Sequence, residues 1–259
     1  MEPQHPMTSV PSVPLARVGR ADGQWSVLGA MAFVAVVMGS AMLAAFLVQT
    51  SYEAWLIRAD RVLTAGWPRP TDPEFLISVQ LAAQVLELLL IWWLTGIWHT
   101  NRSAALGLAP PGLSAAQWVG AVALLFVVKA VVTAVALGIA PTNFNRELGP
   151  FVALVRTPRA WLLFLAAVVL AGLIEELLFR GVLSRTLEST RLGFWGGAAV
   201  ASAAFAVLHL QYGPGGQLVI FAIGMTLAWI RARSGSLWPA IVCHSINNAA
   251  ALFAMRAIS

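Results

Sequence analysis

Charged side chains are scarce in this 259-residue chain: 10% of the residues are Asp, Glu, Lys or Arg, whereas 59% are hydrophobic. Soluble domains carry about 25% charged and about 45–50% apolar residues. The chain therefore has too few polar side chains to cover a compact particle in water, and its mean hydropathy of +0.79 agrees. This composition excludes a disordered chain and a water-soluble enzyme, and it predicts an integral membrane protein.

Cysteine and lysine occur once each in the sequence, as Cys243 and Lys129. A lone cysteine cannot form an intramolecular disulfide, and it leaves no cysteine-based zinc site to consider. The net charge of +5 comes mostly from arginines scattered singly or in pairs between apolar runs. Nucleic-acid binding would need these arginines clustered on one face. We therefore interpret the basic excess as loop topology and contact with membrane lipids, and we expect no nucleic-acid partner.

Seven apolar runs are long enough, or nearly so, to cross about 30 Å of hydrocarbon. They predict an all-α polytopic bundle of about seven spans, with a count between six and eight, because helices satisfy every backbone group in lipid. Residues 1–24 are proline-rich and predict a disordered tail, and residues 25–259 are expected to form a single transmembrane domain. The runs cover roughly residues 26–48, 75–98, 113–138, 160–187, 194–210, 217–230 and 237–255.

The lengths of two of these runs decide how we interpret them. The run 26–48 is 23 residues without charge, longer than a signal-peptide core, so it predicts a retained first span. The amphipathic segment Tyr52–Gly66 after it predicts a separate helix at the membrane interface. The run 217–230 has 14 residues, about 21 Å of helix, which suits a buried or partial span. Basic residues divide equally between the two sides, so the sequence sets no orientation.

Ionisable side chains inside membrane spans are costly and usually functional. The densest group here is Glu175, Glu176 and Arg180. Glu176 and Arg180 are four residues apart and share a helix face, whereas Glu175 points about 100° away. We interpret Glu176 and Arg180 as a structural ion pair and Glu175 as the carboxylate left free for chemistry. The alternative is that both glutamates lie at a helix end near the headgroups and pair with Arg180 and Arg185.

Two further segments carry isolated polar side chains. His209 ends one apolar run, and His244 and Asn248 are four apart on one face of the last run. Taken singly, each is better explained as an interfacial side chain or as a contact between helices. Together with Glu175, they form a set that can activate water and stabilise an oxyanion, as peptide hydrolysis requires. If a metal is bound, Glu175, His209 and His244 are the expected ligands.

Read in order, the three segments resemble the signature of the CAAX protease and bacteriocin-processing family of intramembrane endopeptidases, which includes the Rce1-type prenyl protease. The family pattern is Glu-Glu-x-x-x-Arg, Phe-x-x-x-His and His-x-x-x-Asn or Asp, matched here at residues 175–180, 205–209 and 244–248. The motifs cover about residues 162–250, and the protease core is expected at about 160–255. The resemblance implies that Glu175 is the general base, holding a water together with His209. It further implies that His244 and Asn248 stabilise the tetrahedral oxyanion.

The resemblance also implies a substrate class and a location. We expect a membrane-embedded or lipidated peptide or protein, cleaved in CAAX-type, bacteriocin or regulator processing, by a multi-pass protein of the bacterial cytoplasmic membrane. The family has been described as both metallo- and glutamic proteases. We expect hydrolysis without a cofactor, with zinc as the alternative, because Asn248 is a poor zinc ligand and a good hydrogen-bond donor. The sequence indicates no oligomeric state.

Two other functions remain open. A proton-coupled transporter would also place ionisable groups in its spans, and a catalytically inactive scaffold or immunity protein could use the same fold. Cys243 precedes His244, but neighbouring helical residues diverge by about 100°, so we predict a buried hydrophobe and not a nucleophile. Glu87 and Lys129 are predicted to pair between the second and third spans. A transport path would be lined by Gln80, Gln84, Glu87 and Lys129.

Overall fold

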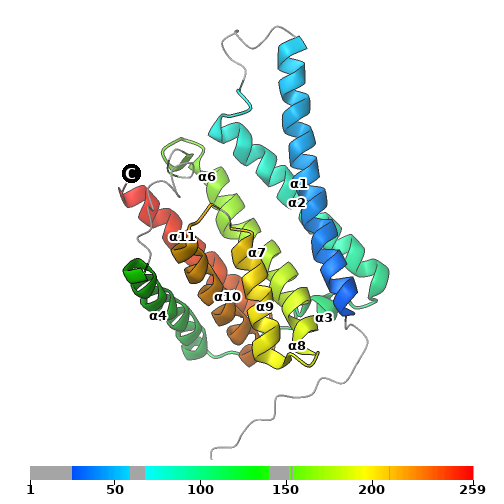
Figure 1. Cartoon of the computed structure of the whole chain (residues 1–259), viewed down its shortest axis with the longest axis vertical. Coiled ribbons are helices and arrows are strands. Elements are labelled where there is room, and N and C mark those ends of the chain that lie inside the picture. Colours follow the sequence, from blue (N-terminus) through cyan, green and yellow to red (C-terminus); the bar gives the residue numbers. More distant parts are fainter. Residues whose placement is uncertain (1–24, 59–67, 140–151, 153, 210, 259) are drawn as a thin grey trace, which may run out of the picture.

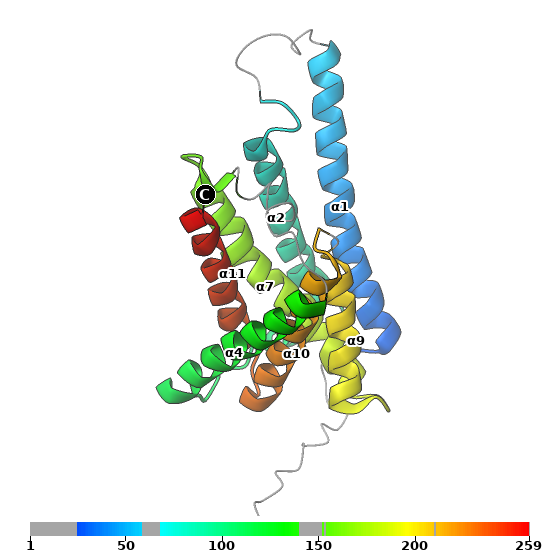
Figure 2. The ribbon, with the colours of Figure 1, turned by 60° about the vertical axis from the view of Figure 1, so that its left-hand side comes forward.

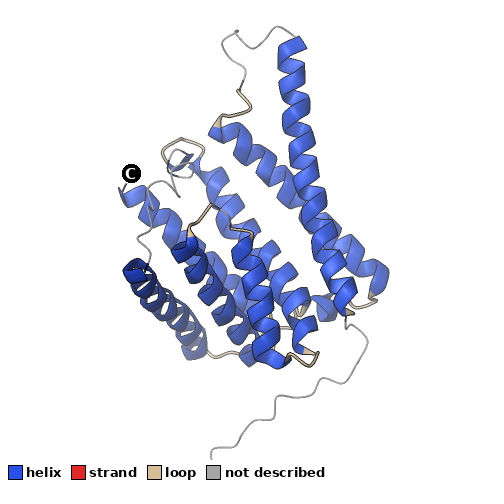
Figure 3. Cartoon of the chain, in the orientation of Figure 1, coloured by secondary structure: helices blue, strands red, loops and turns tan. Residues whose placement is uncertain are grey.

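The computed structural model describes residues 25–58, 68–139, 152, 154–209 and 211–258, and every regular element in these ranges is a helix (Figures 1 and 3). The predicted all-α bundle is therefore confirmed, whereas the tail expected at residues 1–24 lies outside the described residues. The helices outside the central 29-residue segment are α1 (Val27–Arg58), α2 (Pro73–Trp98), α3 (Arg102–Leu106), α4 (Ala115–Ile139), α9 (Gly193–Val207), α10 (Pro214–Ser234) and α11 (Trp238–Ile258).

All seven apolar runs of the sequence correspond to helical segments, but their lengths differ from the prediction. Helix α1 continues to Arg58, so Tyr52–Arg58 extends the first span and does not begin a separate interfacial helix; the rest of that segment, up to residue 66, lies outside the described residues. Helix α10 has 21 residues, long enough to cross, because it begins at Pro214 and ends against Gly235 at a positive φ of 67°. In the described part of the chain, five helices are long and apolar enough to span a membrane.

One 29-residue helix, Ala160–Glu188, crosses the centre of the bundle. It is divided into α6 (Ala160–Leu163), the π-helical stretch η1 (Phe164–Leu170), α7 (Ala171–Glu175), the π-helical stretch η2 (Glu176–Ser184) and α8 (Arg185–Glu188). Wide π-helical turns are rare and often accompany functional sites. The Glu-Glu-x-x-x-Arg motif lies at the junction of α7 and η2.

The other helices surround this central helix. Helices α1 and α2 pack against each other at one edge of the bundle, and α4 lies at the opposite edge against α10 and α11 (Figures 1 and 2). Both α9 and α11 contact the central helix directly. The polar residues of α2 and those of α4 therefore approach the centre from different sides.

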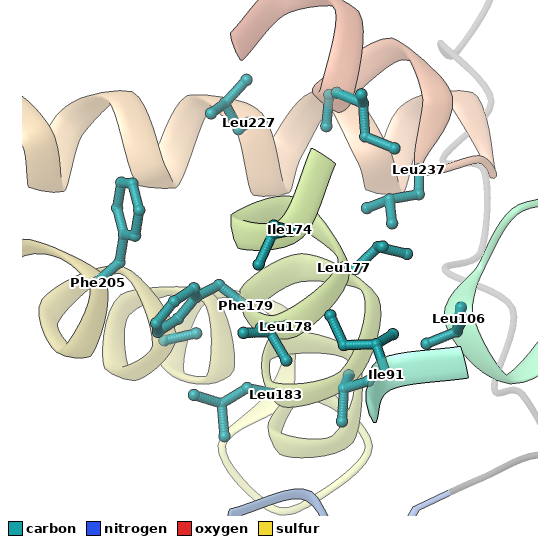
Figure 4. Close-up of a cluster of buried hydrophobic side chains, with 14 of the residues drawn as sticks. Ile91, Leu106, Ile174, Leu177, Leu178, Phe179, Leu183, Phe205, Leu227 and Leu237 are labelled. Carbon is teal, nitrogen blue, oxygen red and sulfur yellow. The ribbon is translucent and has the colours of Figure 1, made fainter. Parts of the chain in front are cut away.

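The largest cluster of buried apolar side chains is centred on η2 (Figure 4). Leu177, Leu178 and Phe179 lie there among Phe205 of α9 and Leu227 of α10, all less than 5% exposed. This packing fixes α9 and α10 against the helix that carries the glutamates. It surrounds the polar residues with a rigid apolar wall.

Candidate active site

The central helix and α11 run antiparallel and approach closely at Gly172. On α11, Asn248 contacts Ala167 of the central helix. His244 lies four residues before Asn248 and contacts Glu176, which lies nine residues after Ala167. A Cβ atom at Gly172 would lie 2.7 Å from the Oγ of Ser245, so a side chain here would crowd the contact between the helices. The missing side chain of Gly172 therefore lets His244 reach the glutamates.

Glu176 accepts hydrogen bonds from two side chains inside the bundle. Its Oε1 accepts a hydrogen bond from Nη1 of Arg180 at 2.8 Å and another from Nδ1 of His244 at 2.9 Å. Glu176 and Arg180 are at most 1% exposed. The predicted ion pair is therefore present, but Glu176 also orients an imidazole, a second role that the sequence spacing did not indicate.

Glu175 faces the other nitrogen of the same imidazole. Its Oε2 lies 3.6 Å from Nε2 of His244, and its side chain is 28% exposed, whereas Glu176 is fully buried. The separation exceeds a hydrogen bond, so the two groups are near neighbours without a direct bond. Glu175 is thus the carboxylate without a hydrogen-bonded cation, as its position on the helix predicted.

His209 lies two residues beyond the C-terminal end of α9, and its Nδ1 is 2.8 Å from the carbonyl oxygen of Phe205. A carbonyl only accepts, so Nδ1 carries the proton and Nε2 of the neutral ring has a lone pair available as a base. The Phe205 ring packs edge-on against both His209 and His244, with centroids 4.6 and 6.0 Å away. The Arg180 guanidinium lies 4.4 Å above the same ring.

The Phe205 ring therefore contacts one residue of each motif, namely Arg180, His209 and His244. Among the described residues, no hydrogen bond or ion pair joins His209 directly to Glu175. Cooperation of these two side chains on a water, as the resemblance implies, stays a prediction.

Asn248 lies one turn beyond His244 on α11. Its Nδ2 donates to the carbonyl oxygen of Ala167 in η1 at 2.8 Å, and its Oδ1 accepts from Nδ2 of Asn247 at 3.1 Å. Only one of its two N–H groups is used by Ala167, so the other remains available as a donor. Asn247 is in turn held by Lys129 of α4, whose Nζ lies 2.8 Å from the Asn247 Oδ1.

The predicted pairing of Glu87 with Lys129 is wrong. Lys129 donates to Asn247, whereas Glu87 of α2 lies near Glu175 of the central helix. The reason is architectural: α2 packs on α1 and the central helix, and α4 packs on α10 and α11 at the other edge. One turn before Glu87, the buried Gln84 donates to the carbonyl oxygen of Ala166 at 3.1 Å.

Sequence reasoning missed Glu87, Lys129 and Asn247 as neighbours of the site. The only signal was the rarity of such residues in apolar runs, which does not say which helix they face.

Cys243 is fully buried, as predicted for a hydrophobe. In the described part of the chain, no three or more His, Cys, Asp or Glu side chains form a group that could hold a metal ion. Zinc binding by Glu175, His209 and His244 stays the alternative prediction.

Comparison with known protein families identifies the C-terminal part of the chain. Residues 157–250 match the family described as type II CAAX prenyl endopeptidase, Rce1-like. This range contains all three motifs, the contacts among Glu175, Glu176, Arg180 and His244, and the contact of His209 with Phe205. No curated protein and no solved structure gives a match. The match indicates that this part of the chain is a protease domain of CAAX type.

Proposed function

Because residues 157–250 match an Rce1-like domain of CAAX prenyl endopeptidase type, we propose that the protein is an intramembrane endopeptidase. We propose that it uses Glu175 to activate water. The observation that carries the proposal is the double contact of Glu176 with Arg180 and His244. It occupies Glu176 and leaves Glu175 beside the free nitrogen of His244. A free carboxylate and a fixed imidazole are the components of general base catalysis.

The proposed reaction begins with a water between Glu175 and His209. Glu175 accepts a proton from this water while the water oxygen attacks the carbonyl carbon of the scissile peptide bond. The carbonyl electrons move onto oxygen, giving a tetrahedral oxyanion. The oxyanion then collapses, the C–N bond breaks, and the leaving amine takes the proton from Glu175.

His244 and Asn248 are proposed to stabilise the oxyanion. The Glu176 carboxylate accepts Nδ1–H and fixes the ring of His244, and in its protonated form the ring also presents Nε2–H toward the reacting group. Asn248 supplies its second N–H. A donor of this kind contributes about 10²–10³-fold to turnover.

The proposed substrate is a membrane-embedded or lipidated peptide or protein whose scissile bond enters the polar region between the central helix, α9 and α11. We propose that the protein acts in the bacterial cytoplasmic membrane without a cofactor and without nucleic acid. On this account a chelator leaves turnover unchanged. Loss of activity with a chelator and recovery with zinc would instead assign Glu175, His209 and His244 to a metal.

The proposal is tested by comparing membranes of cells that produce the wild type or Glu175→Gln. An uncleaved protein should accumulate in Glu175→Gln membranes, together with loss of the peptide terminus that cleavage creates. Glu53→Gln, at an exposed position of α1, is the matched control and should resemble the wild type. Identical terminal peptides in all three membranes would contradict the proposal and favour a scaffold.

A further inference from the structure

A chain of three hydrogen bonds joins α4 to the central helix through α11. Lys129 Nζ donates to Asn247 Oδ1 at 2.8 Å, Asn247 Nδ2 donates to Asn248 Oδ1 at 3.1 Å, and Asn248 Nδ2 donates to Ala167 O at 2.8 Å. Asn247 is 7% exposed and Lys129 is half-buried. The chain ends on the same side chain that the proposed reaction uses as an oxyanion donor.

The two ends of this chain fix the orientation of both amides. An ammonium group only donates, so the oxygen of Asn247 must face Lys129 and its NH2 group must face Asn248. Asn248 then presents its oxygen to Asn247 and its NH2 group to Ala167, whose carbonyl only accepts. With either amide turned over, two acceptors or two donors would face each other. The lysine therefore determines that Asn248 offers an N–H, and not its oxygen, to the substrate side.

The location of Lys129 supports a specific role. A lysine within a membrane span is expensive, and it persists where it has a partner and a function. The partner here is the amide oxygen of Asn247 and not a carboxylate, so Lys129 stands at the end of the chain as its terminal hydrogen-bond donor. Hydrogen bonds in a low-dielectric interior polarise one another, which strengthens the donors further along.

We propose that Lys129 is a positioning residue for peptide hydrolysis: acting through Asn247, it holds the Asn248 amide with one N–H directed at the developing oxyanion. The inference rests on the proposed function. It assigns a role in turnover to α4, which lies outside the Rce1-like domain. A misplaced catalytic group can cost about 10²-fold, so loss of Lys129 is expected to lower kcat by about 10- to 100-fold.

The test uses the purified full-length protein in lipid vesicles, with kcat, KM and the thermal unfolding midpoint measured for each variant. The probe is a peptide ending in a farnesylated Cys followed by three residues, or the segment found to accumulate in Glu175→Gln membranes if the wild type leaves that peptide intact. Lys129→Met should lower kcat by the stated factor with KM within about twofold of the wild-type value, and Lys129→Arg, which keeps the donor, should recover part of the loss. Val127→Met, on the lipid-exposed face of α4, controls for the new methionine.

Two further variants separate positioning from folding. Asn247→Asp keeps a partner for Lys129 but removes the donor to Asn248, so it should lower kcat while the protein still folds. In an Asn248→Ala background, Lys129→Met should cause no further loss of kcat, because the group it positions is gone.

The inference is overturned if Lys129→Met and Asn247→Asp leave kcat unchanged, or if Lys129→Met lowers kcat equally with and without Asn248. Failure of the proposed function has a different outcome, in which Glu175→Gln itself retains full turnover.

Discussion

The N-terminal and C-terminal parts of the chain use apolar helices in different ways. In an 18-residue apolar window of each helix, 17% is buried within the protein in α1, 22% in α2 and 11% in α4, against 50% in the central helix and 44% in α10. The N-terminal helices therefore direct most of their side chains outward to lipid. The C-terminal helices enclose the polar cluster that carries the family motifs.

Helices that face mostly lipid still contribute to the site through one or two polar residues. Gln84 and Glu87 reach the central helix from α2, and Lys129 reaches α11 from α4. Each of these residues stands on a helix that is otherwise mostly apolar.

Arg180→Ala should have the largest effect on stability. It leaves the buried carboxylate of Glu176 without its cation, and breaking a buried pair in this way typically costs about 3–5 kcal/mol. The yield of folded protein and the unfolding midpoint in detergent should both fall sharply. Arg58→Ala, at the exposed end of α1, should change neither, and equal stability of the two variants would contradict the assignment.

Gly224→Ala should cost less but remain measurable. A Cβ atom at this position of α10 would lie 2.8 Å from Ser202 Oγ and 2.9 Å from both Ser202 Cβ and Arg180 Nη2. Overpacking of this kind costs about 1–3 kcal/mol. The comparison is Gly39→Ala in α1, where nothing lies within 4 Å of the new atom, and there the unfolding midpoint should be unchanged or higher.

Gln84→Leu should have a smaller effect. It removes the hydrogen bond to the Ala166 carbonyl, which is worth about 0.5–1.5 kcal/mol. Gln80→Leu, at an exposed position of α2 four residues earlier, is the control and should be neutral. Equal midpoints for the two variants would show that α2 is not held to the central helix through Gln84.

Exchanging the charges of Glu87 and Lys129 in one double variant should not restore expression lost in the single variants. Because the two side chains lie on helices at opposite edges of the bundle, Glu87→Lys with Lys129→Glu should be no better expressed than the worse of the single variants. Restored expression in the double variant would re-establish the pairing expected from the sequence and contradict the contact with Asn247.

The fold and the local relations within each motif could be predicted from the sequence. Each of the seven apolar runs corresponds to a helical segment, whereas the short α3 was not predicted. A spacing of four residues identified the Glu176–Arg180 pair because such residues share a helix face. Contacts between helices could not be predicted in the same way. Nothing in the spacing indicates that Glu176 bonds His244 or that Lys129 bonds Asn247, since both depend on how distant helices pack.

Helix ends were also beyond the sequence pattern. The polar residues of Tyr52–Arg58 suggested a new interfacial helix, but the backbone of α1 continues through them because helix hydrogen bonds do not require an apolar side chain. Likewise α10 extends past its apolar run into Arg231 and Arg233, which lie in its last turn where the helix dipole favours cations.

The most direct test of the account is the turnover of purified Glu175→Gln in lipid vesicles on the peptide that the wild type cleaves, with Glu53→Gln as the control. Glutamine keeps the shape of the side chain and removes the base. The account predicts a fall in kcat of about 10²–10⁴-fold with an unchanged unfolding midpoint, the usual contribution of general base catalysis. Turnover of Glu175→Gln equal to that of Glu53→Gln would contradict it.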